Sequence, residues 1–413
     1  MKKLLLIISL LLINYIANAQ LSINAEYRPR FELRDGYSTL KTDDSEPAYF
    51  TTQRTRLYLR HTYNTVTSNL SIQDYRIWGD SKFKSDDPGL SIYEAWFKLD
   101  LSSRWSLSAG RQSFDIDNKR LFSKANWNQV SLSHDGLNID FMNENFQLKI
   151  FTAFNQAKVS NFGTDYSAQI SNYKFLNVIW LEKKLGNISM ANLTITDGFQ
   201  KEGTTNTDYY RVTSGLIFKY KVPKGNLQLR GFYQTGKNKT GQDINAYFVS
   251  TDYEQKIGNS FQSSLGFELM SGNDLSDTLN MDDNAFDILY GSGHAFNGMM
   301  DYFSTPKTTS NAGLVDVHLK NQAIIKDWSF SLNYYYFALA SYYVYEGKKQ
   351  SKFLANEIDF IANYKVNDII NLELGYGMLF AGKTLEYIKG GYTNGIQQFF
   401  YTMITVKPVF FKN

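Results

Sequence analysis

The sequence of 413 residues contains no cysteine and only six prolines. The absence of cysteine excludes a disulfide scaffold, a cysteine-ligated metal centre and a lipid-modified N-terminal cysteine. The scarcity of proline removes a common interruption of β-ladders. No apolar run is long enough for a membrane-spanning helix, including the one at the N-terminus. A large excess of one sign of charge is also lacking, because the chain has 43 basic and 40 acidic residues. The net charge therefore indicates no particular partner.

Aromatic residues, by contrast, are abundant, with 29 tyrosines, 30 phenylalanines and 6 tryptophans. This composition favours β-strands, and girdles of aromatic side chains are typical of outer-membrane barrels. The N-terminus adds a secretory signal, since Lys2 and Lys3 precede a short apolar stretch that ends in the small-residue sequence Ala17-Asn18-Ala19. We therefore expect residues 1–19 to be a cleaved signal peptide and residues 20–413 to form a single domain.

Arginine and leucine alternate where Arg54, Arg56 and Arg60 lie at even positions with Leu57 and Leu59 between them. A strand points successive side chains to opposite faces, so this segment has one cationic and one apolar face. Charge on a lipid-facing site at the membrane midplane costs roughly 2–4 kcal/mol. In a membrane barrel the leucines would therefore face lipid and the arginines would face a wet interior.

Period-two segments of this kind recur along the whole chain, and the connections between them alternate in length. Tight turns are predicted near residues 64–65, 102–103, 143–144, 186–187, 224–225, 258–259, 326–327 and 367–368. Longer polar links are predicted at 35–49, 79–89, 116–127, 157–170, 198–207, 272–309, 342–350 and 383–394. This pattern predicts an all-β fold, a transmembrane antiparallel up-and-down β-barrel of about 18 strands with short periplasmic turns and long extracellular loops.

Several sequence blocks in order resemble the alginate-export family of outer-membrane proteins. They include NAEYRPRFELRDGYSTL, TQRTRLYLR, SIQDYRIWGD and AGRQSFDIDNKRLFSKANWNQVSLSHDGLNIDF. The last block carries the family's short elements as Gly110-Arg111-Gln112, Arg120-Leu121, Trp127-Asn128-Gln129 and Asp135-Gly136. Later stretches, FDILYGSGHAFNGMMDYF and GYGMLFAGKTLEYIKGG, are similar to blocks of a Bacteroidetes-type, porin-like branch. The resemblance implies an eighteen-stranded barrel whose basic lumen passes anionic polysaccharide or small anions.

Arginine is the most informative residue type, because ten of the twelve arginines lie between residues 28 and 120. Strands that are neighbours in sequence are neighbours in a meander, so these arginines form one cationic wall. The candidate pore-lining, anion-binding residues are Arg28, Arg30, Arg34, Arg54, Arg56, Arg60, Arg111 and Arg120. Alternatively, the arginines brace the barrel by pairing with lumenal carboxylates such as Glu26, Glu32, Glu94 and Asp140.

No other cluster predicts chemistry. Adjacent residues of a strand face opposite ways, so Ser133-His134-Asp135 is not expected to form a catalytic triad. The four histidines show no metal spacing, and we predict no catalytic residue, metal site or cofactor. The 272–309 link is long enough to fold inward as a constriction; its aspartates suit either calcium or plain solvation.

The leading hypothesis is a passive, non-enzymatic channel of the bacterial outer membrane that passes anionic solutes or acidic oligo- or polysaccharide. The expected partners are outer-membrane lipid, small anions or acidic saccharides and the barrel-assembly machinery, with no nucleic acid. The alternatives are a structural or surface-interaction barrel whose pore is closed by a loop, and a barrel hydrolase.

Overall fold

The computed structural model describes residues 19–80, 89–166, 172–204, 207–277, 279–392 and 394–413. The predicted signal peptide lies outside these residues except for Ala19. Within the described residues, no helix has the length and apolar character needed to cross a membrane.

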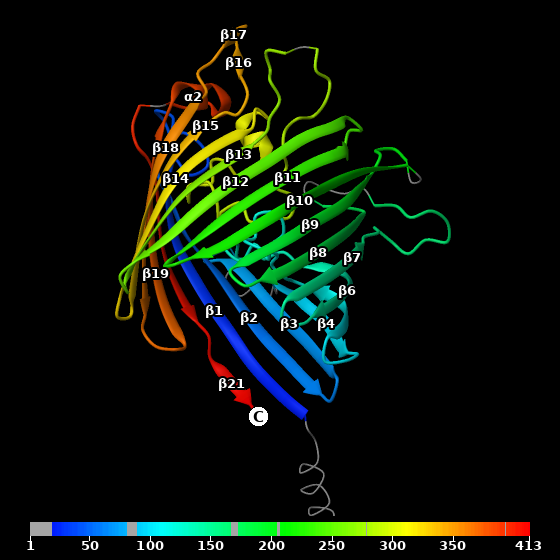
Figure 1. Cartoon of the computed structure of the whole chain (residues 1–413). Helices are drawn as coiled ribbons and strands as arrows, with labels where there is room; N and C mark the ends of the chain where they lie inside the picture. Colours follow the sequence, from blue (N-terminus) through cyan, green and yellow to red (C-terminus); the bar gives the residue numbers. More distant parts are fainter. Residues whose placement is uncertain (1–18, 81–88, 167–171, 205–206, 278, 393) are drawn as a thin grey trace, which may run out of the picture.

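The chain is almost entirely β-structure, and its strands follow one another around a single wall (Figure 1). The first half contains β1 (Ala19–Asp35), β2 (Ala48–Tyr63), β3 (Val66–Ile77), β4 (Leu90–Asp100), β5 (Trp105–Gln112), β6 (His134–Met142), β7 (Phe146–Phe154), β8 (Phe175–Leu185) and β9 (Ile188–Gln200). The second half contains β10 (Asp208–Val222), β11 (Gly225–Lys237), β12 (Asp243–Ile257), β13 (Phe261–Met270), β14 (Leu314–Ile325), β15 (Trp328–Ala338), β18 (Phe353–Lys365), β19 (Ile370–Ala381), β20 (Gln397–Val406) and β21 (Val409–Lys412).

The wall closes on itself because β1 pairs with β2 on one side and with β20 and β21 on the other. Lys407 and Pro408 separate β20 from β21, and the two pieces occupy one position beside β1. The result is a closed antiparallel barrel of 18 strands, which confirms the predicted fold. Closure leaves no free sheet edge, as a hydrocarbon environment requires.

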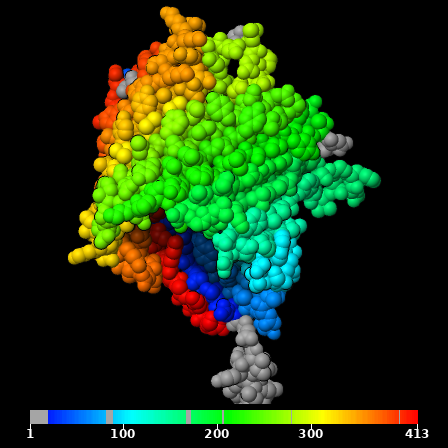
Figure 2. All heavy atoms as spheres, in the orientation of Figure 1, coloured from blue at the N-terminus to red at the C-terminus, as the bar shows by residue number. Residues whose placement is uncertain are grey.

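Side chains alternate across this wall in the sense that the sequence predicted. Leu57 is 37% exposed on the outer face, whereas Arg54 is fully buried on the inner face. On the opposite side of the barrel, Leu229 and Tyr233 are exposed while Arg230 is buried between them. Figure 2 shows the outer wall as a continuous surface, with a hollow at the end near the C-terminus that exposes the inner side of the first strands. The outer face of the barrel is therefore apolar, and the inner face carries the buried charged side chains together with apolar residues of β7 to β9 such as Phe151, Leu176 and Leu193.

The connections also alternate as expected, and all eight predicted tight turns lie between paired strands at one end of the barrel. One connection was missed at the other end. Residues 238–242 join β11 to β12 in a compact turn in which the side chain of Asn238 accepts hydrogen bonds from the backbone of Thr240 and Gln242. This turn is too short to stand out among the longer links on the same rim.

The long-loop rim carries the remaining short elements, namely η1 (Pro306–Thr309), α2 (Lys383–Lys389) and the hairpin of β16 (Val344–Tyr345) and β17 (Lys348–Lys349). Two long connections, residues 113–133 and 271–313, send most of their length into the barrel. Phe122 and Tyr302 are fully buried there, and Phe122 forms a bridge to Tyr290. The sequence left open whether the 272–309 link folds inward; in the structure most of it does, and a second inward loop accompanies it.

Candidate functional site

A row of arginine side chains lines the inner face of β1 and β2. Arg28 and Arg54 lie directly opposite each other in the antiparallel register, and the neighbouring even positions repeat the pattern. Arg54 is fully buried, and Arg28 is only 4% exposed. We call this set the arginine wall; its members are Arg28, Arg30, Arg34, Arg54 and Arg56.

Carboxylates neutralise only part of this wall. Arg54 Nε donates to Glu26 at 2.9 Å, and Glu32 accepts from Arg30 at 2.7 Å and from Arg34 at 2.6 Å. These two glutamates are both among the bracing partners that the sequence suggested. The other two suggested partners bond elsewhere: Glu94 accepts from Ser113, and Asp140 pairs with Lys149. The wall thus retains excess positive charge.

Most of the other hydrogen bonds of the arginine wall are directed at the 113–133 loop, apart from one from Arg56 Nε to Gln73 on β3. Four of the arginines donate to uncharged oxygen atoms of this loop, most of them backbone carbonyls. These bonds run from Arg28 to Asn126 O (2.8 Å), Asn128 O (3.0 Å) and Gln129 Oε1 (3.0 Å), from Arg30 to Trp127 O (2.9 Å), from Arg54 to Asn128 O (3.1 Å) and Ser131 Oγ (3.2 Å), and from Arg56 to Ser131 Oγ (2.9 Å). The loop is bound through its carbonyl edge.

The opposite end of the same loop is held by ion pairs on the far side of the barrel. Asp117 accepts from Arg230 on β11 at 2.5 Å and from Lys219 on β10 at 2.6 Å. Burial acts to raise the pKa of Asp117, but the hydrogen bonds and charges of Arg230 and Lys219 hold it below its ordinary value. Arg120 pairs with Glu268 on β13. Because β10 and β11 lie opposite β1 in the strand order, the loop crosses the lumen.

The 271–313 loop binds a different part of the barrel, the inner face of β18, and there the loop supplies the hydrogen-bond donors. Its backbone N–H groups at Met299 and Met300 donate to Asp359 at 3.0 Å and to Glu357 at 2.9 Å, two carboxylates on the inner face of β18. The preceding residue, Gly298, has a φ of +81°, and a Cβ atom there would lie 2.3 Å from Glu357 Oε1. This loop is bound through its amide edge to an acidic part of the wall.

Asn297 extends the same pattern along the acidic wall. Its side-chain amide donates to Glu268 on β13 at 2.9 Å and to Asp316 on β14 at 2.8 Å. Two parts of the barrel interior therefore differ in charge: the arginine wall holds carbonyl oxygens, and the carboxylates of β13, β14 and β18 hold N–H groups.

Side chains of the two inward loops contact one another and side chains at the end of β1, and together these contacts form a closed ring. The rings of Trp127 and His294 stack at 3.8 Å with an angle of 7° between them, and Arg30 lies 4.1 Å above the Trp127 ring. His294 Nδ1 is 2.9 Å from Asp301, which also accepts a hydrogen bond from the Tyr37 hydroxyl. We call this set the loop-closing ring; its members, each in contact with the next, are Arg30, Trp127, His294, Asp301, Tyr37, Arg34 and Glu32.

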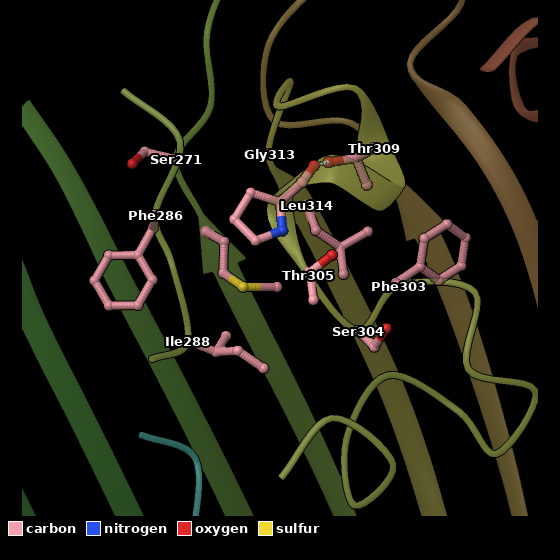
Figure 3. Close-up of a pocket in the computed structure, with 11 residues that line it drawn as sticks. Ser271, Phe286, Ile288, Phe303, Ser304, Thr305, Thr309, Gly313 and Leu314 are labelled. Atoms are coloured by element: carbon pink, nitrogen blue, oxygen red, sulfur yellow. Dashed lines mark hydrogen bonds between the residues drawn. The ribbon is translucent and has the colours of Figure 1, made fainter. Parts of the chain in front are cut away.

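Two cavities adjoin these loops, and they differ in character. A polar cavity of about 190 Å³ lies beside the ring and is lined by Ala125, Trp127, Asn128, Ser292, Gly293, His294, Asp301 and Ser304. The second cavity, between the 271–313 loop and the start of β14, is apolar; Figure 3 shows Phe286, Ile288, Phe303 and Leu314 around it. Its volume is only about 10 Å³, space for a single water at most. The loop is thus packed on apolar side chains at the start of β14, and a polar cavity adjoins it at the ring.

The eight predicted arginines lie in four places. The arginine wall brings five of them together, and Arg60 lies below it on the same inner face, exposed and 5.9 Å from the Trp96 ring. Arg120 belongs to the inward loop rather than to a strand.

Arg111 requires a correction, because it does not face the lumen. It pairs in register with Asp135 and Ala95, which share the outer face with the exposed Leu137 and Phe97, and its guanidinium binds the Asp135 carboxylate at 2.8 Å. Gly110 and Gln112 take the inward positions of this strand. We therefore remove Arg111 from the pore-lining set.

Two further groups of residues considered in the sequence can be placed in the structure. His134 points inward to Tyr173, with 2.8 Å between Nδ1 and the hydroxyl, while Asp135 points outward to Arg111, so Ser133-His134-Asp135 does not converge. Within the described residues, no group of three or more His, Cys, Asp or Glu is placed to hold a metal ion. Sequence reasoning missed the role of Trp127, His294 and Asp301, for which loop length was the one available signal.

The sequence matches the alginate export family over residues 19–397. No curated protein sequence matches the chain. Solved structures with a similar fold include Pseudomonas aeruginosa OpdK with vanillate (TM-score 0.61, 13% identity, covering 95% of this chain and 99% of that one). Others are P. aeruginosa OccD3 (OpdP; TM-score 0.61, 13% identity, 96% and 93%) and Acinetobacter baumannii OccAB4 (TM-score 0.62, 13% identity, 95% and 98%).

At this level of identity the solved structures establish the fold alone. The family match covers most of the chain, including both inward loops and the arginine wall. The chain therefore belongs to the alginate export family, and this membership together with the closed barrel identifies it as a non-enzymatic outer-membrane channel.

Proposed function

We propose that this channel passes anionic solutes, small carboxylates or acidic saccharides, along the arginine wall. The observation that carries the proposal is the charge imbalance of that wall, where Glu26 and Glu32 are shared among five arginines. Guanidinium groups bind carboxylates through two parallel hydrogen bonds, and a row of them lowers the electrostatic barrier for anions. The excess charge favours anion passage over simple bracing, which would need about one carboxylate for each arginine.

The distribution of exposed arginines supports a path through the lumen. The Arg34 side chain is 37% exposed near the long-loop rim, and Arg60 is exposed near the short-turn rim. The buried Arg28 and Arg54 lie between them, at the level of the 113–133 loop. An anion that moves along β1 and β2 would thus meet guanidinium groups above, at and below the constriction.

Ion selectivity in planar bilayers tests the proposal. Wild-type protein under a potassium chloride gradient should give a reversal potential of the anion-selective sign. Arg60→Gln should shift this potential toward cation preference, because Arg60 is exposed in the lumen and its loss leaves no buried charge unpaired. Arg111→Gln is the matched control, since its guanidinium lies on the outer face and should not influence the current. Equal reversal potentials for wild type and Arg60→Gln would contradict a role of the wall in selectivity.

One observation favours the second candidate, a barrel closed by its loops that acts at the cell surface. The 113–133 loop crosses the lumen, and the loop-closing ring joins it to the 271–313 loop. A barrel that inserts into the bilayer but carries no current under any gradient would support this candidate.

A further inference from the structure

We propose that residues 126–131 act as a built-in ligand of the arginine wall, and that a multivalent carboxylate displaces them to open the path along it. We call this segment the strap. The inference rests on the proposed function, because it assigns the gating of the channel to the same anions that would permeate it.

The chemistry of the strap supports displacement. Its sequence, NWNQVS, contains no charged residue, so the arginines of the wall bind only neutral oxygen atoms in it. A carboxylate accepts two parallel N–H bonds from one guanidinium and supplies the negative charge that the strap lacks. Arg28 is the clearest case, because its bonds go to carbonyl and amide oxygens at Asn126, Asn128 and Gln129. An anion that reaches Arg28 therefore offers a stronger partner than the one present.

The rest of the loop is fixed by charge, which limits the movement to the strap. Asp117 and Arg120 hold the first half of the loop through ion pairs with Arg230 and Glu268. Ser123 lies in this half, where its backbone N–H donates to Tyr290 O at 2.9 Å. Between the two halves, Ala125 has a φ of +48°, which marks a sharp change of chain direction. The neutral half can thus leave the wall while the charged half stays.

Displacement of the strap would also open the loop-closing ring. Trp127 belongs to the strap and is the member of the loop-closing ring that contacts His294. If the strap moves, this stack breaks and the loop-closing ring opens, while the anchored half keeps its backbone hydrogen bonds to the 271–313 loop, such as the one from Ser123 N–H to Tyr290 O. An anion bound at the arginine wall would therefore open the ring without detaching the second loop.

Cysteine labelling tests this directly, since the natural chain has no cysteine. Ser131→Cys places a thiol in the strap, and Ser123→Cys places one in the anchored half; both serines are buried. In detergent-solubilised, folded protein, citrate should raise the rate of reaction of Ser131→Cys with a neutral maleimide at least about fivefold, the lower end of ordinary coupling between sites. Sodium chloride at equal ionic strength should not have this effect, and Ser123→Cys should stay protected in both salts.

A second variant tests whether citrate acts through the arginine wall. Adding Arg28→Gln to Ser131→Cys should raise the citrate concentration needed for half-maximal exposure. The inference is overturned if citrate leaves Ser131→Cys protected, or if it exposes both cysteines equally, which would indicate general loosening of the loop. Anion-selective current in bilayers with no citrate-dependent labelling would refute the strap and leave the proposed function standing. Labelling without any anion current would refute the proposed function instead.

Discussion

Gly298 provides the sharpest test of how the inward loops are held. Substitution by alanine places a methyl group at a φ of +81°, which costs roughly 1–2 kcal/mol for a residue with a Cβ. The new Cβ would lie 2.3–2.4 Å from three atoms of the Glu357 carboxyl group, so the carboxylate must move. Its hydrogen bond from Met300 N–H is then lost, and a buried N–H group without a partner costs about 1–3 kcal/mol. The total of about 2–5 kcal/mol lowers the ratio of bound to released loop by about 30-fold or more.

The expected result for Gly298→Ala is a loop that leaves the acidic wall while the barrel stays folded. Limited proteolysis in detergent should cut within the 271–313 loop, and single channels should show a larger and noisier current. Gly347→Ala is the control, because Gly347 has a comparable φ of +74° but no atom within 4 Å of its Cβ position. If the two variants give the same cleavage pattern and conductance, the hydrogen bonds of Glu357 and Asp359 do not determine the position of the 271–313 loop.

Two further perturbations address the other contacts. Trp127→Ala removes the ring stack on His294, so the single-channel conductance should rise and the 271–313 loop should become more sensitive to protease. An unchanged conductance would show that the loop-closing ring is not a barrier to ions. In the folded state the pKa of Asp117 lies below its ordinary value of 3.8. The stabilisation from its ionised carboxylate should be complete above pH 3.8 and should be lost as the pH falls through the lower pKa of the folded state. In thermal melts followed by circular dichroism, Asp117→Asn should therefore lower the Tm at neutral pH and flatten the acid limb; an unaltered acid limb would contradict this assignment.

The sequence was sufficient for the barrel because the evidence for each strand is local. Alternation of Arg54 and Arg56 with Leu57 identifies an inner and an outer face without any knowledge of distant residues. Turn residues such as Asn367 and Asp368 likewise mark the short-turn rim within a few positions. Arg111 was misplaced because the assignment followed residue type rather than the alternation, which puts it on the same face as Leu107.

The inward loops could be expected from their length, but not their destinations. Arg28 binds carbonyl oxygens of residues about a hundred positions away, and a backbone carbonyl is the same acceptor in any sequence. The contact between Met299 N–H and Asp359 is invisible for the same reason. What the sequence did show was an uneven distribution of arginine, and this feature proved to mark the wall that holds the first loop.

The separation of charge around the barrel explains why two loops of different sequence can occupy one lumen. A backbone segment has an edge of carbonyl oxygens and an edge of N–H groups, and a buried segment must satisfy both. Arg28 and Arg54 satisfy the carbonyl edge of the first loop, whereas Glu357 and Asp359 satisfy the amide edge of the second. If both charges were mixed along one wall, either loop could bind in several registers. Segregation therefore gives residues 126–131 of the first loop and residues 297–300 of the second loop different parts of the wall, and the positive charge that Glu26 and Glu32 do not offset lies beside the uncharged segment.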